Sequence, residues 1–169
     1  RLASIRIIPK ITSAVPKAAD PDSADPDPVP AIVSPLPPPD DTTPAVESRE
    51  LVLNSIEPFV DEQLRQAVTA FNPRQPTYRQ YRLWFLLDAS KDQSNENQAP
   101  GGRIGNLWLD GNTPSDASDD LRLASNLYDI TFKHETDNVV ELTVIAKGFV
   151  KRAIGGRTLD QQIYSTRVH

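Results

Sequence analysis

Near the C-terminal end of the chain, apolar and polar residues alternate along two consecutive segments. In residues 128–133 the apolar positions are Tyr128, Ile130 and Phe132, and in residues 140–147 every second residue is again apolar. A period of two places one set of side chains on a core and the other in water, as in a half-buried strand. Turn formers at 135–138 separate the two segments, so we predict a β-hairpin.

A third run of β-branched and aromatic residues, 163–168, ends the chain and predicts another strand. Between it and the hairpin, residues 148–160 are basic and contain glycines, so we expect a connection there. The three strands together would form a C-terminal meander.

The segments before this meander predict one helix and further strands. Residues 56–71 carry apolar residues at helical spacing, with Ser55 as N-cap and Asn72-Pro73 as the stop. Residues 51–53 and 78–87 favour strands, and the second becomes apolar on both faces, as in the centre of a sheet. A helix whose apolar side packs on an antiparallel sheet gives the predicted fold class, α+β.

The first third of the chain predicts two further regions. Residues 1–15 have apolar residues at three-residue intervals, with Pro9 inside the run, so we expect a helix that ends or kinks there. Residues 16–45 are rich in proline and aspartate, which favours an extended surface loop that Ile32, Val33 and Leu36 could fix to the domain. Residues 46–169 would form the globular α+β domain.

Four short motifs in the last 65 residues carry a resemblance to a known family. They are a Gly-Asn-Leu-Trp-Leu-Asp-Gly strand and turn at 105–111, a Leu-Ala-Ser-Asn lead-in at 123–126, a Val-x-Leu-x-Val strand at 140–144 and a Tyr-Ser-Thr-x-Val strand at 164–168. In this order the motifs resemble the C-terminal half of type IV minor pilins and type II secretion pseudopilins, especially the PilW and GspJ-like group.

The resemblance implies a pilin-like fold and a structural role without catalysis. Such a subunit helps to initiate or cap a type IV pilus-like filament through contacts with other minor pilins or pseudopilins and with the major pilin. It is anchored in the inner membrane by an N-terminal helix, exposes a periplasmic ectodomain, and then enters the filament or the extracellular space. Residues 1–11 are too short and too charged to cross a bilayer, which needs about 20 apolar residues. We therefore expect an ectodomain cut just after the membrane helix, with residues 1–15 as the lower end of that helix.

Composition limits the other classes of function. The net charge of −5 favours solubility and argues against a dominant surface for nucleic acid or anionic membrane. The chain has no cysteine, which excludes disulfides, thiolate metal sites and cysteine nucleophiles.

Two basic groups are candidate binding surfaces for a partner protein or DNA. The first interleaves arginines with aromatic residues between positions 74 and 84, and the second lies between positions 147 and 157. Guanidinium groups bind phosphates and aromatic faces stack on bases, so the first group allows a nucleic-acid interpretation. The candidate residues of the two groups are Arg74, Arg79, Arg82, Lys151, Arg152 and Arg157.

The sequence predicts no catalytic residue, cofactor or metal. It has two histidines and lacks a nucleophile elbow, a phosphate-binding loop and a paired-histidine metal motif. The acidic loop 110–120 could bind calcium, but its spacing differs from the EF-hand and favours a solvated loop. The alternatives to a pilin-like subunit are a secreted or viral structural or binding domain unrelated to pilins, and a DNA- or surface-binding adhesin at a pilus tip.

Overall fold

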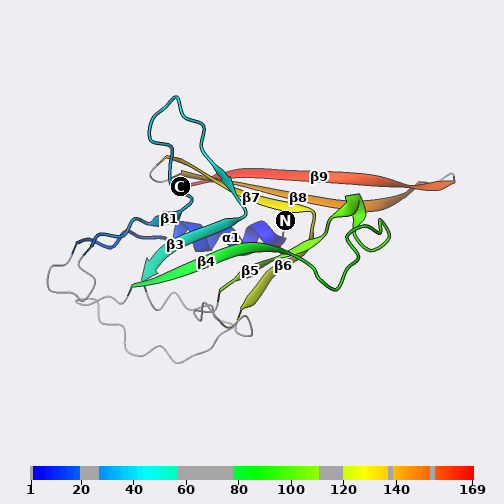
Figure 1. The fold of residues 1–169 in the computed structure, drawn as a ribbon, viewed down its shortest axis with the longest axis horizontal. Helices are drawn as coiled ribbons and strands as arrows, with labels where there is room; N and C mark the ends of the chain where they lie inside the picture. The colour runs from blue at the N-terminus through cyan, green and yellow to red at the C-terminus, as the bar shows by residue number, and fades with distance from the viewer. Residues whose placement is uncertain (1, 20–26, 57–77, 111–119, 137–138, 153–154) are drawn as a thin grey trace.

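The computed structural model of this chain describes residues 2–19, 27–56, 78–110, 120–136, 139–152 and 155–169. Within these ranges the chain forms one α-helix, one short 3-10 turn and nine antiparallel strands (Figure 1). The elements are α1 (Leu2–Thr12), β1 (Ile32–Ser34), β2 (Glu47–Ser48), β3 (Glu50–Ile56), β4 (Tyr78–Leu87), η1 (Pro100–Gly102), β5 (Gly105–Leu109), β6 (Leu121–Leu127), β7 (Asp129–Thr136), β8 (Val139–Arg152) and β9 (Gly156–Val168).

The strands form two sheets. The chain passes between them three times, once over residues 35–46 between β1 and β2, and twice at a single residue. The first sheet has the order β1-β3-β4-β5-β6 and the second has the order β2-β7-β8-β9. The chain crosses from β2 to β3 at Arg49, and from β6 to β7 at Tyr128. Asn126, just before the crossing at Tyr128, has a φ of 59°, a left-handed conformation that asparagine adopts more readily than most residues.

Both sheets direct alternate side chains into one hydrophobic core. In β4 the buried apolar residues are Tyr81, Leu83 and Phe85, and in β7 they are Ile130 and Phe132. Full burial of such a side chain contributes about 1.5 to 3 kcal/mol, so this alternation largely determines which way each strand faces. The remaining buried strand residues of the cluster are Ile32, Leu51, Leu53, Leu107, Leu109, Leu123, Leu127, Val140, Leu142, Val144 and Val168.

Helix α1 adds to this core from the side. Ile7 and Ile11, one turn apart on the helix, are 0% and 5% exposed and belong to the same cluster. The helix packs beside β6 and β9, which are one edge strand of each sheet. It continues past Pro9 to Thr12. Among the described residues, no helix has the length and apolar content that a membrane crossing requires.

The predicted α+β class is wrong, because the described fold is mostly antiparallel β. The two sheets bury each other's apolar faces, so neither needs a helix to cover it, and α1 lies at their side. The helix predicted over residues 56–71 starts at the last residue of β3 and otherwise lies outside the described residues. The described part of the chain therefore does not have the architecture of a pilin-like helix packed on a single sheet.

Several predicted strands are confirmed. Residues 51–53 lie in β3, residues 78–87 form β4 in the middle of its sheet, and residues 105–109 form β5. The C-terminal hairpin and meander are present as β7, β8 and β9, paired in chain order. In the proline-rich region Ile32 is buried as expected, while Leu36 is 68% exposed and does not fix the loop.

The connection predicted over residues 148–160 is wrong. β8 runs on to Arg152 and β9 begins at Gly156, so most of this segment is paired strand. Gly148, the first residue of the predicted connection, lies inside β8 opposite Asp160. The left-handed glycine of this hairpin is Gly155, with a φ of 63°.

Candidate interaction surface

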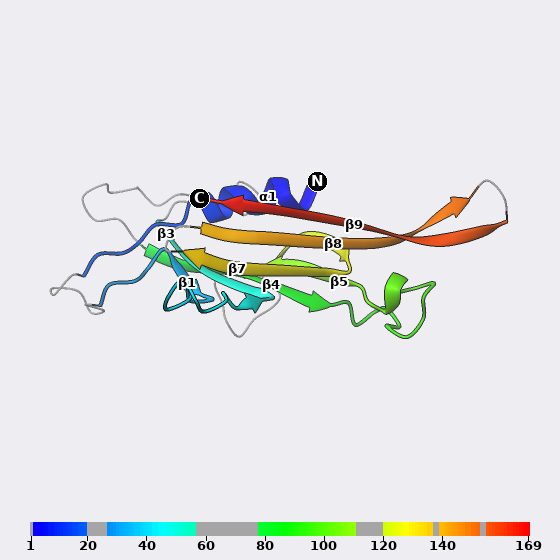
Figure 2. The same ribbon diagram turned by 90° about the horizontal axis from the view of Figure 1, so that it is seen from above.

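The β8–β9 hairpin extends beyond the rest of its sheet and forms an arm. Strand β7 begins at Asp129, which pairs with Ile145 of β8. Past that pair β8 is bonded only to β9, and Figure 2 shows the two strands leaving the body as a ribbon. We use the name arm for residues 146–152 and 156–162.

The base of the arm is held against the body by Lys147. Its ammonium nitrogen lies 3.6 Å from the centroid of the Tyr128 ring, a cation–π contact. A Cβ atom added to Gly101 of η1 would lie 2.6 Å from the Lys147 side chain, so this turn packs closely on the same lysine. The arm is therefore fixed at its base and projects from there.

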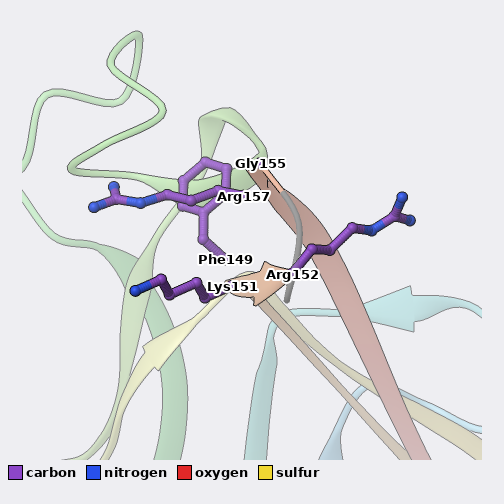
Figure 3. Close-up of a pocket in the computed structure, with 6 residues that line it drawn as sticks. Phe149, Lys151, Arg152, Gly155 and Arg157 are labelled. Carbon is purple, nitrogen blue, oxygen red and sulfur yellow. The ribbon is translucent and has the colours of Figure 1, made fainter.

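The arm tip, residues 149–152 and 156–159, carries apolar and basic side chains on both faces. On one face Phe149 pairs with Leu159, and Lys151 pairs with Arg157. The opposite face carries Val150 and Arg152, whose partners are Thr158 and Gly156. Figure 3 shows Lys151 and Arg157 on one side of the ribbon and Arg152 on the other. An open hollow of about 660 Å³ is lined by Phe149, Lys151, Arg152, Gly155, Gly156 and Arg157.

Strand β9 also leaves a sheet edge open. It is the last strand of its sheet and spans 13 residues, longer than most strands in globular proteins. Figure 2 places α1 beside the C-terminal part of β9, and no described element lies along the rest of its outer edge. Ile163 and Tyr164, near the middle of this edge, are 61% and 41% exposed.

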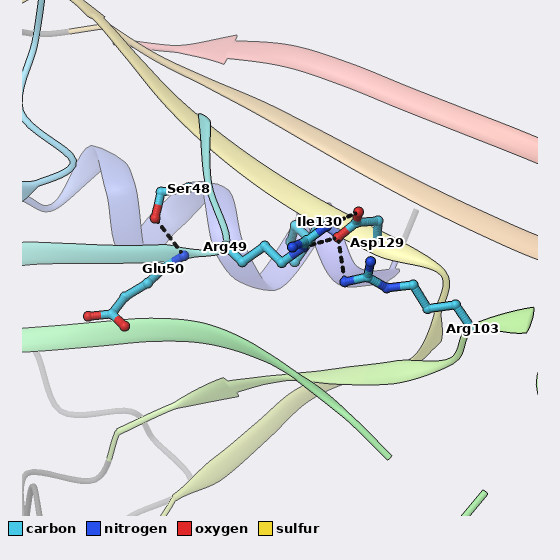
Figure 4. Close-up of polar contacts among 6 residues, drawn as sticks. All are labelled: Ser48, Arg49, Glu50, Arg103, Asp129 and Ile130. Atoms are coloured by element: carbon cyan, nitrogen blue, oxygen red, sulfur yellow. Dashed lines mark hydrogen bonds and ion pairs between the residues drawn. The ribbon is translucent and has the colours of Figure 1, made fainter. Parts of the chain in front are cut away.

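A cluster of charges around Asp129 joins the two single-residue crossings between the sheets, at Arg49 and Tyr128 (Figure 4). Arg49 donates two hydrogen bonds to the Asp129 carboxylate, 2.8 Å from Nε to Oδ1 and 2.9 Å from Nη2 to Oδ2. Arg103 donates a third at 3.4 Å, and the backbone N–H of Ile130 donates one at 2.9 Å. Arg49 and Tyr128 are the two crossing residues, so this cluster fixes one sheet relative to the other.

These contacts also set the ionisation of Asp129. Burial alone would raise the pKa of its carboxyl group, since the charged form loses hydration. The hydrogen bond from Arg49 and the charges of Arg103 and Arg49 outweigh this effect, and the pKa lies below its ordinary value. The carboxylate therefore stays charged near neutral pH and acts as a structural link.

The structure separates the arginines of the first predicted basic group. Along β4, Arg79 lies on the same face as the buried Tyr81, while Arg82 lies on the opposite face. Arg82 donates a 2.8 Å hydrogen bond to Glu50 and stacks over Trp84 at 5.0 Å from the ring centroid. Arg74 lies outside the described residues. Arg79 and Arg82 therefore do not form one continuous surface.

The second predicted basic group is brought together. Lys151, Arg152 and Arg157 all lie at the arm tip.

The possible calcium loop 110–120 falls mostly on residues 111–119, outside the described ranges. His134 is buried, and its Nδ1 lies 2.8 Å from the carbonyl oxygen of Pro35, so it anchors the proline-rich segment to the second sheet.

Sequence reasoning missed two features, the apolar residues of the arm tip and the ion pair at the junction of the sheets. Phe149 and Leu159 were not candidates because they fell in a segment predicted as a connection, although each lies two residues from a basic residue on the same face. The Arg49–Asp129 pair spans 80 positions and leaves no local pattern.

No family model, curated protein or solved structure matches this chain.

Proposed function

We propose that this chain is a structural subunit without enzymatic activity, which joins neighbouring subunits through the open edge of β9. The supporting observation is the length and exposure of that edge, with Ile163 and Tyr164 near its middle. An unpaired edge presents a row of backbone donors and acceptors that a strand of another chain can complete. Globular proteins usually cover or interrupt such edges, so a long open one favours a partner.

The specific form of this proposal is a minor pilin or pseudopilin. It is supported by the order of the motifs between residues 105 and 168, and it does not depend on the helix-on-sheet fold that proved wrong. In this form the chain helps to initiate or cap a type IV pilus-like filament. Its partners are other minor pilins or pseudopilins and the major pilin, and it is anchored in the inner membrane before assembly.

Replacing Ile163 with lysine tests the edge contact. A lysine on an edge strand opposes pairing with another strand, and Ile163 is 61% exposed, so the fold should tolerate the change. We expect Ile163→Lys to lower the amount of the protein in sheared filament fractions by about tenfold, the effect of roughly 1.4 kcal/mol of lost contact energy. The matched control is Val46→Lys, at a residue 66% exposed before β2. Equal incorporation of the two variants would contradict the proposal.

The N-terminal sequence of the native protein, purified from membranes, tests the filament form separately. An N-methylated residue heading an apolar helix of about 20 residues would support it. An ordinary secretion leader would remove the pilin form and leave an edge-binding structural domain.

A further inference from the structure

The arm has a charge opposite to that of the rest of the chain. Between residues 146 and 162 it carries four basic residues and one acidic residue, a formal charge of +3. The whole chain carries −5, so the remainder carries −8. The negative net charge, which in the sequence argues against an anionic partner, therefore describes the body and not the arm.

The basic side chains of the arm tip have no counter-charge among the described residues. The side chains of Lys151, Arg152 and Arg157 make no hydrogen bond or ion pair with another described residue. Lys151 and Arg157 lie directly opposite each other on one face, where like charges destabilise a strand pair. An external anion bound between them would remove that repulsion.

Exposed apolar residues accompany these charges on both faces of the ribbon. Phe149 is 36% exposed and Leu159 is 39% exposed on one face, and Val150 is 49% exposed on the other. A protein strand or a nucleic acid would cover one face or one edge. A lipid bilayer surrounds an inserted tip, so it can contact both faces at once, with headgroup phosphates near the cations and acyl chains near the apolar groups.

The length of the arm separates its tip from the acidic body. Arg152 lies seven residues beyond Ile145, the last residue of β8 that is paired with β7. At ~3.3 Å per residue this is about 23 Å, well beyond the Debye length of ~8 Å at physiological salt. The charge of the body is therefore screened from a surface that the tip touches.

We propose that the arm tip docks on an anionic lipid bilayer. Lys151, Arg152 and Arg157 bind the headgroup phosphates, and Phe149, Val150 and Leu159 enter the interface between headgroups and acyl chains. This docking and the β9 edge contact proposed above are tested at different residues, because the tip comprises residues 149–152 and 156–159 while Ile163 lies outside the arm.

Charge reversal at the tip tests the electrostatic part. The wild-type chain should co-sediment with phosphatidylcholine vesicles only when they contain phosphatidylglycerol, and high salt should weaken the binding. Each basic residue near an anionic surface strengthens binding by about fivefold, so Lys151→Glu with Arg157→Glu should weaken it by at least about 25-fold. The double variant Lys17→Glu with Arg122→Glu changes the net charge equally outside the arm and should keep most of the binding.

Insertion has its own readouts. Phe149→Ser should weaken vesicle binding by about tenfold, while Val46→Ser, a similar loss of exposed apolar area on the body, should not. Because the chain has no cysteine, Thr158→Cys and Ala89→Cys each allow one environment-sensitive dye to be attached. With anionic vesicles the dye at position 158 should shift to shorter emission wavelength, and the dye at position 89 should not.

Four results would overturn the proposal. They are no co-sedimentation at low salt, equal loss of binding in the charge-matched control, unchanged binding of Phe149→Ser, and no emission shift at position 158. Binding of the tip to duplex DNA or polyphosphate without vesicle binding would also exclude it. Ile163→Lys should leave vesicle binding intact, so failure of either proposal can be recognised independently.

Discussion

Gly105 shows how a single residue without a side chain can be required by close packing. It is buried at the start of β5, and an added Cβ would lie 2.5 Å from both the carbonyl oxygen of Leu86 and the ring of Phe85. One of these neighbours is backbone, which cannot rotate away. The position is therefore fixed by the approach of two strands and not by backbone conformation.

We expect Gly105→Ala to lower the free energy of unfolding by about 1 to 3 kcal/mol, the usual effect of overpacking a core. The control is Gly148→Ala in the arm, where an added Cβ meets no atom within 4 Å. That variant should stay within about 0.5 kcal/mol of the wild type. Urea denaturation measures both, and equal effects would contradict the packing explanation.

The same two glycines show what the sequence can reveal at this scale. Alternation of apolar residues correctly predicted the inward faces of β4 and β7, because burial is repeated along each strand. A lone glycine carries no such repetition. Gly148 was interpreted as part of a connection, yet it lies within a strand, and the crowding at Gly105 depends on residues 85 and 86 in the neighbouring strand.

At the scale of elements, the junction of the two sheets depends on Asp129. Its pKa is lowered in the folded state, so its contribution to stability is present at neutral pH. That contribution declines as the pH falls below the ordinary value of about 3.9 and is lost once the pH passes the lower pKa of the folded state. Asp129→Asn should destabilise the fold by about 1 to 2 kcal/mol at neutral pH, since Arg49 and Arg103 lose a charged acceptor. The half exposure of Arg49 keeps the effect within this range.

The difference in unfolding free energy between wild type and Asp129→Asn should therefore shrink as the pH is lowered to about 3 or below. Urea denaturation at a series of pH values measures it. Asp160→Asn, at an exposed carboxyl group of the arm, is the control and should change the stability little at any pH. A constant difference for Asp129→Asn across this range would show that the ion pairs with Arg49 and Arg103 do not carry the effect.

The elements that sequence predicted well were those with local signals. The turn formers in the sequence at 135–138 and the alternation on either side of them predicted the β7–β8 hairpin. The distribution of strands between two sheets had no such signal, because two of its three crossings are made at single residues, Arg49 and Tyr128. The α+β prediction followed from the helical spacing of residues 56–71, whose apolar side was expected to pack on one antiparallel sheet.

At the scale of the whole molecule, the core and the arm are separate in both packing and charge. The buried residues of β8 and β9 end at Val144 and begin again only at Val168, so the arm adds nothing to the core cluster. Core residues usually serve to pack the fold, whereas exposed residues on a projecting element are free to bind other molecules. The arm is therefore the part of this fold that can change without loss of the body.

Removing the arm tests this separation. A variant in which residues 148–160 are replaced by Asn-Gly joins Lys147 directly to its cross-strand partner Gln161 through a two-residue hairpin turn. Because the described side chains that are deleted lie outside the core cluster, the unfolding free energy should change by less than about 1 kcal/mol. Binding to phosphatidylglycerol vesicles should be lost, since the deletion removes every apolar and basic residue of the tip. A body that unfolds would show that the core depends on the arm, and a body that still binds the vesicles would place the membrane contact outside the arm. A folded body that no longer binds would locate that contact in the arm.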